Sequence, residues 1–291
     1  MILTTDIPFI QSVAHYDTLT RSQLTRLHLP DDDGRLTRRR VKAIREPGLL
    51  NVTTMQVVNP NVNHGVSGPV YYSSADGVAF LAQELEDDKY LRVNTTTPHH
   101  LFLYHFVAVA ETHILLDRAA PLAGAKLIEW IGERAFADPK ATEPQHRYRL
   151  YQVVSEPNAQ HRVVCIPDAG FLLDDGHDGR KVFLLEQDRD TTKNAERVAN
   201  QKAGGFAGMW EKKLHQRLFP AANVEKFTVL VIAPTKKRIN ALRKAFATKP
   251  SSWLYKFASL EDLKETTLLS GKVWYSCAGD EPGSLLREVS S

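Results

Sequence analysis

Hydrophobic residues in the first third of the chain recur every three or four positions, which is the spacing of amphipathic helices. The pattern predicts one helix in residues 6–17 and a second in residues 19–29, for which Thr20 is the expected N-cap. A third helix is expected within residues 31–50, and Pro47 should end it because proline disrupts a helix interior. The chain therefore begins with three short helices.

Two strands are predicted to follow these helices. Residues 49–58 and 68–74 are rich in β-branched and aromatic residues, and a polar loop joins them. Three helices followed by a hairpin are typical of a winged helix-turn-helix, which we expect over residues 1–93. In this arrangement the loop between the two strands is the wing. We expect three of its side chains to contact the DNA backbone: Asn61, Asn63 and His64.

A further helix is predicted in residues 73–91. Helices in this position often serve dimerisation or dock the next domain, so a homodimer is one expected assembly. The polar residues 92–98 are the candidate linker to a second domain, which we expect over residues 98–291.

Five basic side chains of the third helix fall within roughly one third of its circumference, at about 100° per residue. They are Arg35, Arg38, Arg39, Lys42 and Arg45. Val41 and Ile44 lie on the opposite side and should face a core. This arrangement is expected of a recognition helix that enters the major groove of DNA. The alternative is a solvated basic face in a scaffold domain.

The second domain is predicted to start with a buried helix over residues 99–120, apolar on nearly all sides. Three strands, a helix, a strand and a helix should follow in this order. Their segments are residues 125–136, 162–173, 180–188, 191–219, 225–235 and 236–246, with a further short extended segment at 148–156. We expect the helix in 191–219 to be interrupted by its three glycines, Gly204, Gly205 and Gly208. The αβββαβ order indicates an α+β or α/β sandwich, and no G-x-G-x-x-G or Walker sequence appears.

Carboxylates interrupt this apolar pattern near one end of the predicted sheet. Asp168 opens one strand, and Glu186 and Asp188 close the next. The turn between them contains two glycines, so the two strands should be adjacent and antiparallel. Glu111 stands on the buried helix, where a carboxylate is costly unless it is paired or bound to a cation. The simplest explanation for it is an ion pair with a nearby arginine such as Arg118.

Several acids that meet at one sheet edge would suit a hard divalent cation such as Mg²⁺. We expect at least three of the four carboxylates to converge, with a raised pKa for at least one of them. The alternative is that each acid pairs separately with an arginine. The candidates for such pairs are Arg162, Arg189 and Arg197.

The acid pattern resembles that of the PD-(D/E)xK, or restriction-endonuclease-like, nucleases. Pro167-Asp168 matches the first part of that motif and Glu186-Gln187-Asp188 the second, but Asp188 replaces the lysine. In that superfamily the lysine can come from the following helix, where Lys202 is the best candidate and Lys193 the second. The resemblance implies that Asp168 and Glu186 hold Mg²⁺, that Glu111 and Asp188 assist, and that Lys202 orients or activates water.

The chain also resembles the replication-relaxation family of plasmid and mobile-element proteins. The resemblance rests on four stretches in their order and spacing, residues 99–116, 163–173, 181–206 and 227–246. It covers most of residues 1–248 and implies a winged helix followed by a nuclease-like α/β domain. The implied role is in plasmid replication, DNA relaxation or related mobile-element biology.

Composition adds few further constraints. The 291 residues are 43% hydrophobic and 24% charged with a net charge of +3, which alone is no nucleic-acid signature. Two cysteines exclude a disulfide framework and a cysteine-type zinc site. No apolar run approaches the ~20 residues of a membrane span, and the first residues do not resemble a signal peptide, so we expect a cytoplasmic protein.

Two hypotheses remain open at this stage. In the first, the protein binds DNA through the third helix and nicks or cleaves it with Mg²⁺ at the acid cluster. In the second, it is a non-catalytic DNA-binding initiator or regulator, and the acids are structural.

Overall fold

The computed structural model describes residues 3–55, 68–156, 161–177 and 179–286. The expected wing residues Asn61, Asn63 and His64 lie outside these ranges. The chain divides into two compact units, Met1–Ile114 and Leu115–Ser291, and helix α5 (Leu103–Leu122) crosses the division. The expected boundary at residues 92–98 precedes that helix and stays a prediction.

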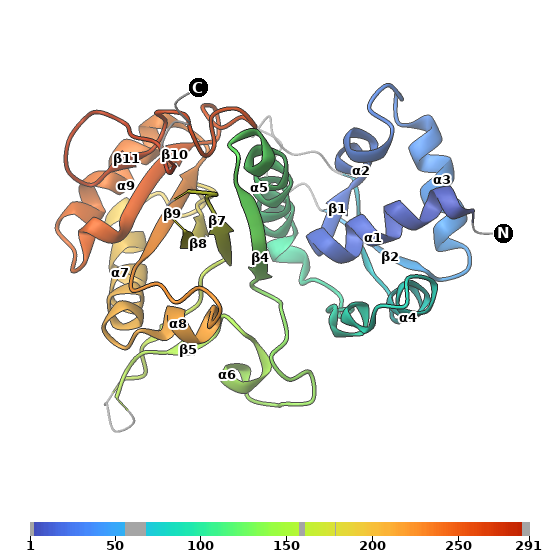
Figure 1. Cartoon of the computed structure of the whole chain (residues 1–291), viewed down its shortest axis with the longest axis horizontal. Helices are drawn as coiled ribbons and strands as arrows, with labels where there is room; N and C mark the ends of the chain where they lie inside the picture. Colours follow the sequence, from blue (N-terminus) through green and yellow to red (C-terminus); the bar gives the residue numbers. More distant parts are fainter. Residues whose placement is uncertain (1–2, 56–67, 157–160, 178, 287–291) are drawn as a thin grey trace. The chain divides into compact units, whose positions relative to one another are not determined.

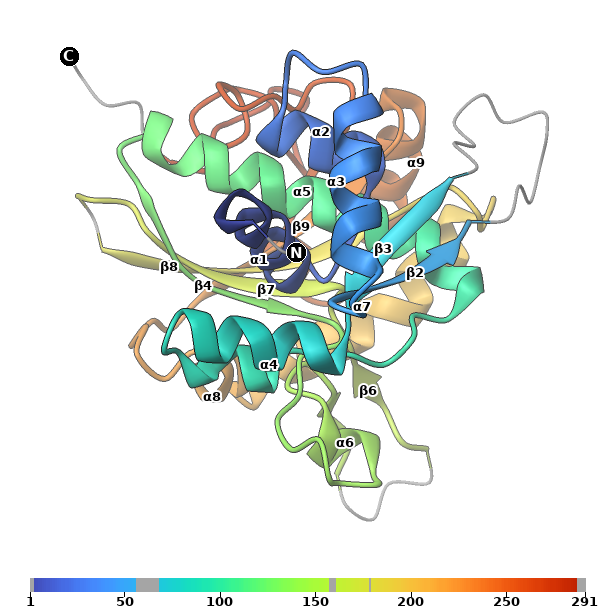
Figure 2. The ribbon, with the colours of Figure 1, turned by 90° about the vertical axis from the view of Figure 1, so that its right-hand side faces the viewer.

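The N-terminal unit contains the predicted three helices, two strands and further helix in the predicted order (Figures 1 and 2). They are α1 (Ile7–Tyr16), α2 (Arg21–His28), α3 (Arg35–Arg45), β2 (Leu50–Thr54), β3 (Pro69–Ser73) and α4 (Ala75–Glu84). Strand β1 (Thr18–Thr20) was not predicted, because three residues between two helices are too short to show an alternating pattern. It pairs with β3, which gives an antiparallel sheet in the order β1-β3-β2.

Local signals in the sequence explain where these helices begin. The Thr20 hydroxyl accepts a hydrogen bond from the Gln23 N–H at 3.2 Å, and the Gln23 side chain accepts one from the Thr20 N–H at 2.9 Å. This capping box confirms the predicted N-cap. The carboxylate of Asp32 accepts from the N–H groups of Leu36 and Thr37, which satisfies two free donors in the first turn of α3.

Both units also contain short 3-10 helices. They are η1 (Thr4–Asp6), η2 (Asp88–Arg92), η3 (His100–Phe102) and η4 (Ser252–Leu254). Among the described residues, no helix is both long enough and apolar enough to cross a membrane.

The C-terminal unit is built on a six-stranded sheet in the order β11-β10-β9-β8-β7-β4 (Figure 1). The strands are β4 (Lys126–Gly132), β7 (Ala169–Asp174), β8 (Arg180–Gln187), β9 (Phe227–Ala233), β10 (Tyr255–Ser259) and β11 (Tyr275–Ser276). Strands β4, β7 and β8 pair antiparallel, whereas β8, β9 and β10 run parallel. The mixed α and β fold class is therefore confirmed, as is the antiparallel pairing of the strands that follow Asp168 and precede Asp188.

Helices cover one face of this sheet. They are α7 (Ala195–Glu211), α8 (Leu214–Leu218) and α9 (Lys236–Ala247), while the one-turn helix α6 (Pro144–Arg147) lies in the connection between β4 and β7. Side chains of α7 and α9, such as Phe206 and Leu242, share a core with Leu184 of β8 and Val229 of β9. Strands β7 and β8 are buried on both faces, as their nearly continuous apolar runs predicted.

The prediction that glycines interrupt the helix in 191–219 is wrong, because α7 runs unbroken through all three. A Cβ at Gly205 would lie 3.1 Å from the Val164 carbonyl, and one at Gly208 would lie 2.8 Å from the Val154 Cβ. Gly205 and Gly208 let α7 approach β6 (Val164–Cys165) and the residue that follows β5 (Gln152–Val153). Their role is close packing of a helix rather than its termination.

Candidate functional site

Three acidic residues stand in a row across neighbouring strands at one end of the sheet. In the register of the sheet, Gly132 pairs with Ala169, and Ala169 pairs with Leu185. One position beyond these pairs lie Glu133 after β4, Asp168 before β7 and Glu186 in β8. The Glu133 N–H donates to the Asp168 carbonyl at 3.1 Å, and the Asp168 N–H donates to the Leu185 carbonyl at 2.9 Å.

The three acids belong to the face of the sheet that α7 covers. Side chains alternate along a strand, so Glu133 points to the same side as Ile131, and Glu186 to the same side as Leu184. Ile131 and Leu184 both belong to the core that contains residues of α7. Carboxylate oxygens of Glu133 and Asp168 lie within 4.8 Å of each other. The row is therefore a cluster of carboxylates at the edge of a buried core.

Asp168 and Glu186 are nearly buried, each with 9% of its surface exposed. The Asp168 carboxylate accepts a hydrogen bond from the Gln187 N–H at 2.6 Å, which ties it to the end of β8. Carboxylates in such a place need a cation or further donors, because burial without them is costly.

Lys202 of α7 supplies a positive charge to this cluster. Its Nζ lies 2.6 Å from Oε2 and 2.9 Å from Oε1 of Glu186, and 3.5 Å from the Ile166 carbonyl. Burial would lower the pKa of Lys202, but the carboxylates of Glu186 and Asp168 outweigh burial and raise it. The lysine expected from the following helix therefore reaches the acids and stays protonated. Lys193, the second candidate, has an exposed side chain.

Asp188 lies in a separate ion pair with Arg238 of α9. Arg238 Nη2 lies 2.8 Å from Asp188 Oδ2, and its Nε lies 3.0 Å from Oδ1, which is a bidentate arrangement. The guanidinium is only 4% exposed, and its hydrogen bonds to Asp188 raise the pKa of Arg238. The acid at the lysine position of the motif thus anchors α9 to the end of β8. Its arginine partner is none of the three that the sequence suggested.

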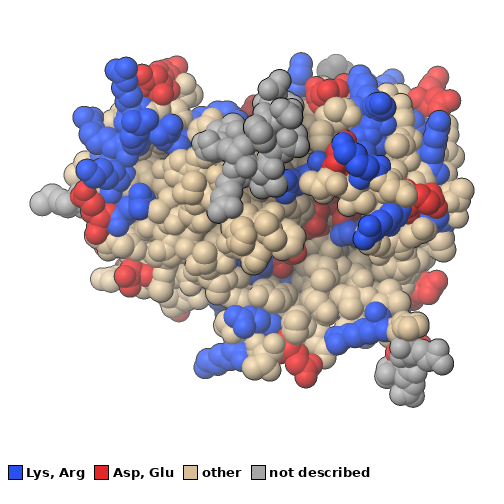
Figure 3. Space-filling model, turned by 180° about the vertical axis from the view of Figure 1, so that it is seen from behind, with Lys and Arg blue, Asp and Glu red and all other residues tan. Residues whose placement is uncertain are grey.

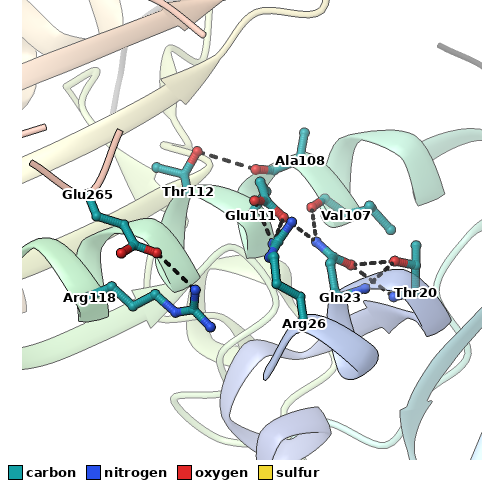
Figure 4. A network of polar contacts seen from close by, with 9 residues as sticks. All are labelled: Thr20, Gln23, Arg26, Val107, Ala108, Glu111, Thr112, Arg118 and Glu265. Carbon is teal, nitrogen blue, oxygen red and sulfur yellow. Dashed lines mark hydrogen bonds and ion pairs between the residues drawn. The ribbon is translucent and has the colours of Figure 1, made fainter. Parts of the chain in front are cut away.

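Glu111 is bound within the N-terminal unit. Its carboxylate accepts hydrogen bonds from Arg26 at 2.6 and 2.7 Å and from Gln23 at 3.0 Å (Figure 4). Arg118, its expected arginine partner, instead pairs with Glu265 at 2.9 Å. The role of Glu111 in completing the acid cluster stays a prediction.

Sequence reasoning missed Glu133. The residue lies within the strand predicted over residues 125–136, whereas β4 ends at Gly132, and neither this strand end nor its partner strand was visible in the sequence. Only the pairing of β4 with β7 brings it beside Asp168. A predicted pairing of these strands would have identified it.

The donor set suits a hard divalent cation. Carboxylate oxygens are preferred ligands of Mg²⁺, and two ligands of one ion at about 2.1 Å lie roughly 3 to 4 Å apart. The carboxylate oxygens of Glu133 and Asp168 lie within 4.8 Å of each other, which is compatible with that geometry. Glu186 is the third ligand available, and Lys202 competes with a cation for it. Glu133 and Asp168 are therefore the residues whose oxygens lie close enough together to share an Mg²⁺ ion, and Glu186 stands beside them in the row, held by Lys202.

The basic side chains of α3 form a second candidate surface. All five lie on the exposed side of the helix, while Val41 and Ile44 are buried, as predicted. Arg35 pairs with Asp33 and Lys42 with Glu46, but these pairs are highly exposed and hold their partners weakly. In the described part of the chain the remaining three form no ion pair: Arg38, Arg39 and Arg45. Figure 3 shows Lys and Arg side chains gathered on this unit.

Arg40, which was not assigned to the basic arc, has a structural role instead. Its Nη1 lies 3.2 Å from the buried carboxylate of Asp6, which precedes α1. The pair joins α3 to η1, so the half-buried Arg40 has a different role from the exposed basic residues of this helix.

Comparison with protein families gives a match to a model described as replication-relaxation, over residues 10–221. This span is more than half of the 291 residues, and it includes α3, Glu133, Asp168, Glu186 and Lys202. Comparison with curated proteins and with solved structures gave no match.

Proposed function

Because the chain belongs to the replication-relaxation family, we propose that it is a DNA-binding protein of plasmid or mobile-element replication with a nuclease-like, Mg²⁺-dependent site. One observation carries the nuclease part of the proposal, namely the row of three carboxylates with Lys202 at its side. A cluster of this kind is costly to a fold that does not use it.

The N-terminal unit supports the DNA-binding part. Its helices α1 to α3, its hairpin β2–β3 and the added strand β1 have the order of a winged helix-turn-helix. The second helix of the helix-turn-helix motif would be α3, and its exposed arginines would contact phosphates and base edges in the major groove. A homodimer remains part of the proposal, to be tested by sedimentation velocity.

The C-terminal unit supports a restriction-endonuclease-like arrangement. With the short elements α6, β5, β6 and α8 set aside, the order α5, β4, β7, β8, α7, β9 follows the predicted αβββαβ pattern, with Pro167-Asp168 directly before β7 and Glu186 in the adjacent strand β8. Bound Mg²⁺ would stabilise negative charge on a phosphodiester and lower the pKa of water. Asp168, Glu186 and Glu133 would hold the ion, and Asp188 would act indirectly by fixing Arg238 and α9.

Lys202 would then act as a cation rather than as a base. Its raised pKa keeps the ammonium protonated at neutral pH, so it cannot accept a proton from water. A protonated lysine beside the acids can orient a phosphate oxygen and offset the charge that develops there.

A second candidate function is favoured by the same lysine. Both oxygens of Glu186 are already engaged by Lys202, so the cluster is partly neutralised without any metal. A degenerate domain that only binds DNA would look like this. The two functions differ in whether Mg²⁺ binds and cleavage follows.

A plasmid-nicking assay separates the two functions. Supercoiled DNA is incubated with the full chain in Mg²⁺ or in chelator, using wild type, Asp168→Asn and the control Asp190→Asn. Nicking that needs Mg²⁺ and is lost only in Asp168→Asn supports the nuclease. Absence of nicking by wild type, together with normal DNA binding, rejects it in favour of the binding-only function.

A further inference from the structure

The connection between β4 and β7 begins and ends at the acid row. We call residues 134–163 the arm; it directly follows Glu133, and only residues 164–167 separate it from Asp168. The arm contains α6 and β5 and ends one residue before β6, and residues 157–160 lie outside its described part. Both ends of the arm are therefore tied to the acid row by the chain.

The arm is rich in basic and aromatic residues. Its sequence holds five basic and three acidic residues. The basic residues are Arg134, Lys140, Arg147, Arg149 and Arg162. Glu156, one of the acids, is engaged by Lys212 of α7 at 2.7 Å.

A stacked aromatic pair with an arginine lies three residues beyond Glu133. Phe136 and Tyr148 form an isolated bridge, and their rings stack with centroids 5.7 Å apart. The guanidinium of Arg147 lies 5.3 Å from the Phe136 centroid and 5.8 Å from that of Tyr148. Hydrogen bonds from Ala137 N–H to the Arg147 carbonyl and from Arg149 N–H to the Ala135 carbonyl hold the two segments together.

A second arginine and aromatic ring repeat this arrangement nearer to Asp168 along the chain. The guanidinium of Arg162 lies 5.8 Å from the Tyr151 centroid, and its Nη2 donates to Gln145. Both rings of the first pair and the ring of Tyr151 are only partly buried.

Structural support alone does not explain these arginines. Arg149 has such a role, because it pairs with Glu129 at 2.7 Å and donates to the Leu218 carbonyl. Within the described residues, Arg147 and Arg162 form no ion pair with a carboxylate, although the Nε of Arg147 is itself buried. Guanidinium groups that lie beside aromatic faces and are not held by a carboxylate are suited to phosphates and bases.

We propose that the arm holds an unpaired nucleic-acid strand against the acid row. Bases of this strand stack on the surface of Phe136, Tyr148 and Arg147, and Arg162 contacts its backbone. A duplex offers only base edges to a protein, so ring faces at the site select a strand whose bases are free to stack. This inference rests on the proposed function, because it takes nucleic acid as the ligand. It adds that the nucleic acid at the site is an unpaired strand.

The test measures binding apart from cleavage. The full chain carries Asp168→Asn so that it cannot cleave. Fluorescence anisotropy measures its binding to a labelled single strand of about 16 nucleotides and to the corresponding duplex. This length is the upper end of the site size of one single-strand-binding domain. Arg147→Gln removes the charge, and Tyr148→Leu removes the flat ring but keeps an apolar side chain. Arg180→Gln is the matched control, because Arg180 lies at the opposite end of β8 from Glu186. Circular dichroism confirms that each variant is folded.

Both arm variants should weaken single-strand binding by roughly tenfold and duplex binding by less than about twofold. The control should change neither. Equal losses for single strand and duplex, or no loss for the single strand, would overturn the inference. If wild type does not nick DNA but the arm variants still lose single-strand binding, the nuclease proposal fails and the inference stands. If nicking occurs and the variants bind normally, the inference alone fails.

Discussion

Lys202 holds both carboxylate oxygens of Glu186, with its Nζ 2.6 Å from one and 2.9 Å from the other. The pair joins α7 to β8 at the acid row, and its ammonium occupies a position that a metal ion would also favour. Removing this charge while keeping the length of the side chain therefore tests stability, metal binding and cleavage together.

Lys202→Met should lower the free energy of unfolding by about 1–3 kcal/mol, because Glu186 loses its counter-charge in a mostly buried place. The lysine side chain is 36% exposed, so solvent limits the loss. Mg²⁺ should bind more tightly to the variant in calorimetric titration, since no ammonium competes for Glu186. If the site cleaves DNA, the rate should fall by roughly 100-fold despite tighter binding. Tighter binding with unchanged nicking would show that Lys202 is not catalytic.

The pH dependence of this pair follows from the direction of the pKa shift. The Lys202 pKa is raised above its ordinary 10.5 because Glu186 and Asp168 outweigh burial. A group with a raised pKa in the folded state contributes stability that is complete below 10.5 and is lost as pH rises above it. The stability difference between wild type and Lys202→Met should therefore be smaller at about pH 11 than at about pH 8. A difference that grows with pH would contradict the assigned pair.

Asp188 offers a structural contrast to the acids of the row. Asp188→Asn leaves the guanidinium of Arg238, which is 4% exposed, with one hydrogen bond fewer and only the more exposed carboxylate of Asp190 as a counter-charge. We expect a loss of about 2–3 kcal/mol in urea denaturation. Asp190→Asn is the matched control, because Asp190 is 42% exposed and contacts the same arginine at 3.3 Å. It should cost less than about 1 kcal/mol. Equal losses in the two variants would mean that the bidentate pair does not anchor α9.

The glycines of α7 give opposite predictions within one helix. Gly204→Ala should stabilise the protein by about 0.5–1 kcal/mol, because a Cβ there meets nothing within 4 Å and alanine favours the helix. Gly208→Ala should destabilise it by about 1–3 kcal/mol, because the new Cβ would lie 2.8 Å from the Val154 Cβ. Thermal unfolding monitored by circular dichroism measures both changes. Stabilisation by both substitutions would show that α7 does not pack closely on β5.

Local signals in the sequence predicted most helices and strands, because caps, periodicity and turn residues act over a few positions. The resemblance to the PD-(D/E)xK nucleases pointed to Asp168 and Glu186, and to Lys202 as the lysine that the following helix supplies. Glu133 and Arg238 escaped, because their positions depend on which strand pairs with β4 and how α9 docks. The error about Gly205 and Gly208 has the same origin. A glycine needed for close packing cannot be distinguished by sequence from one that ends a helix.

The exposed arginines of α3 allow a test of DNA binding that does not depend on cleavage. Replacement of Arg38, Arg39 and Arg45 by alanine should weaken binding of duplex DNA, because each cation that contacts a phosphate releases a counterion. The logarithm of the affinity is plotted against the logarithm of the salt concentration. The slope of this plot should become shallower by roughly 1 for each phosphate that the variant no longer neutralises. Folding should be unaffected, since these side chains are exposed and form no ion pair in the described part of the chain.

Arg92→Ala is the matched control for that variant, because Arg92 is an exposed arginine of η2 in the same unit. Its salt slope should equal that of wild type. A second comparison uses Arg40→Ala, which removes the partner of the buried Asp6 and should lower stability instead of the slope. If the triple variant keeps the wild-type slope, α3 does not contact phosphates, and its basic face is only solvated. A slope that falls equally in the Arg92→Ala control would indicate a non-specific effect of net charge rather than a recognition helix.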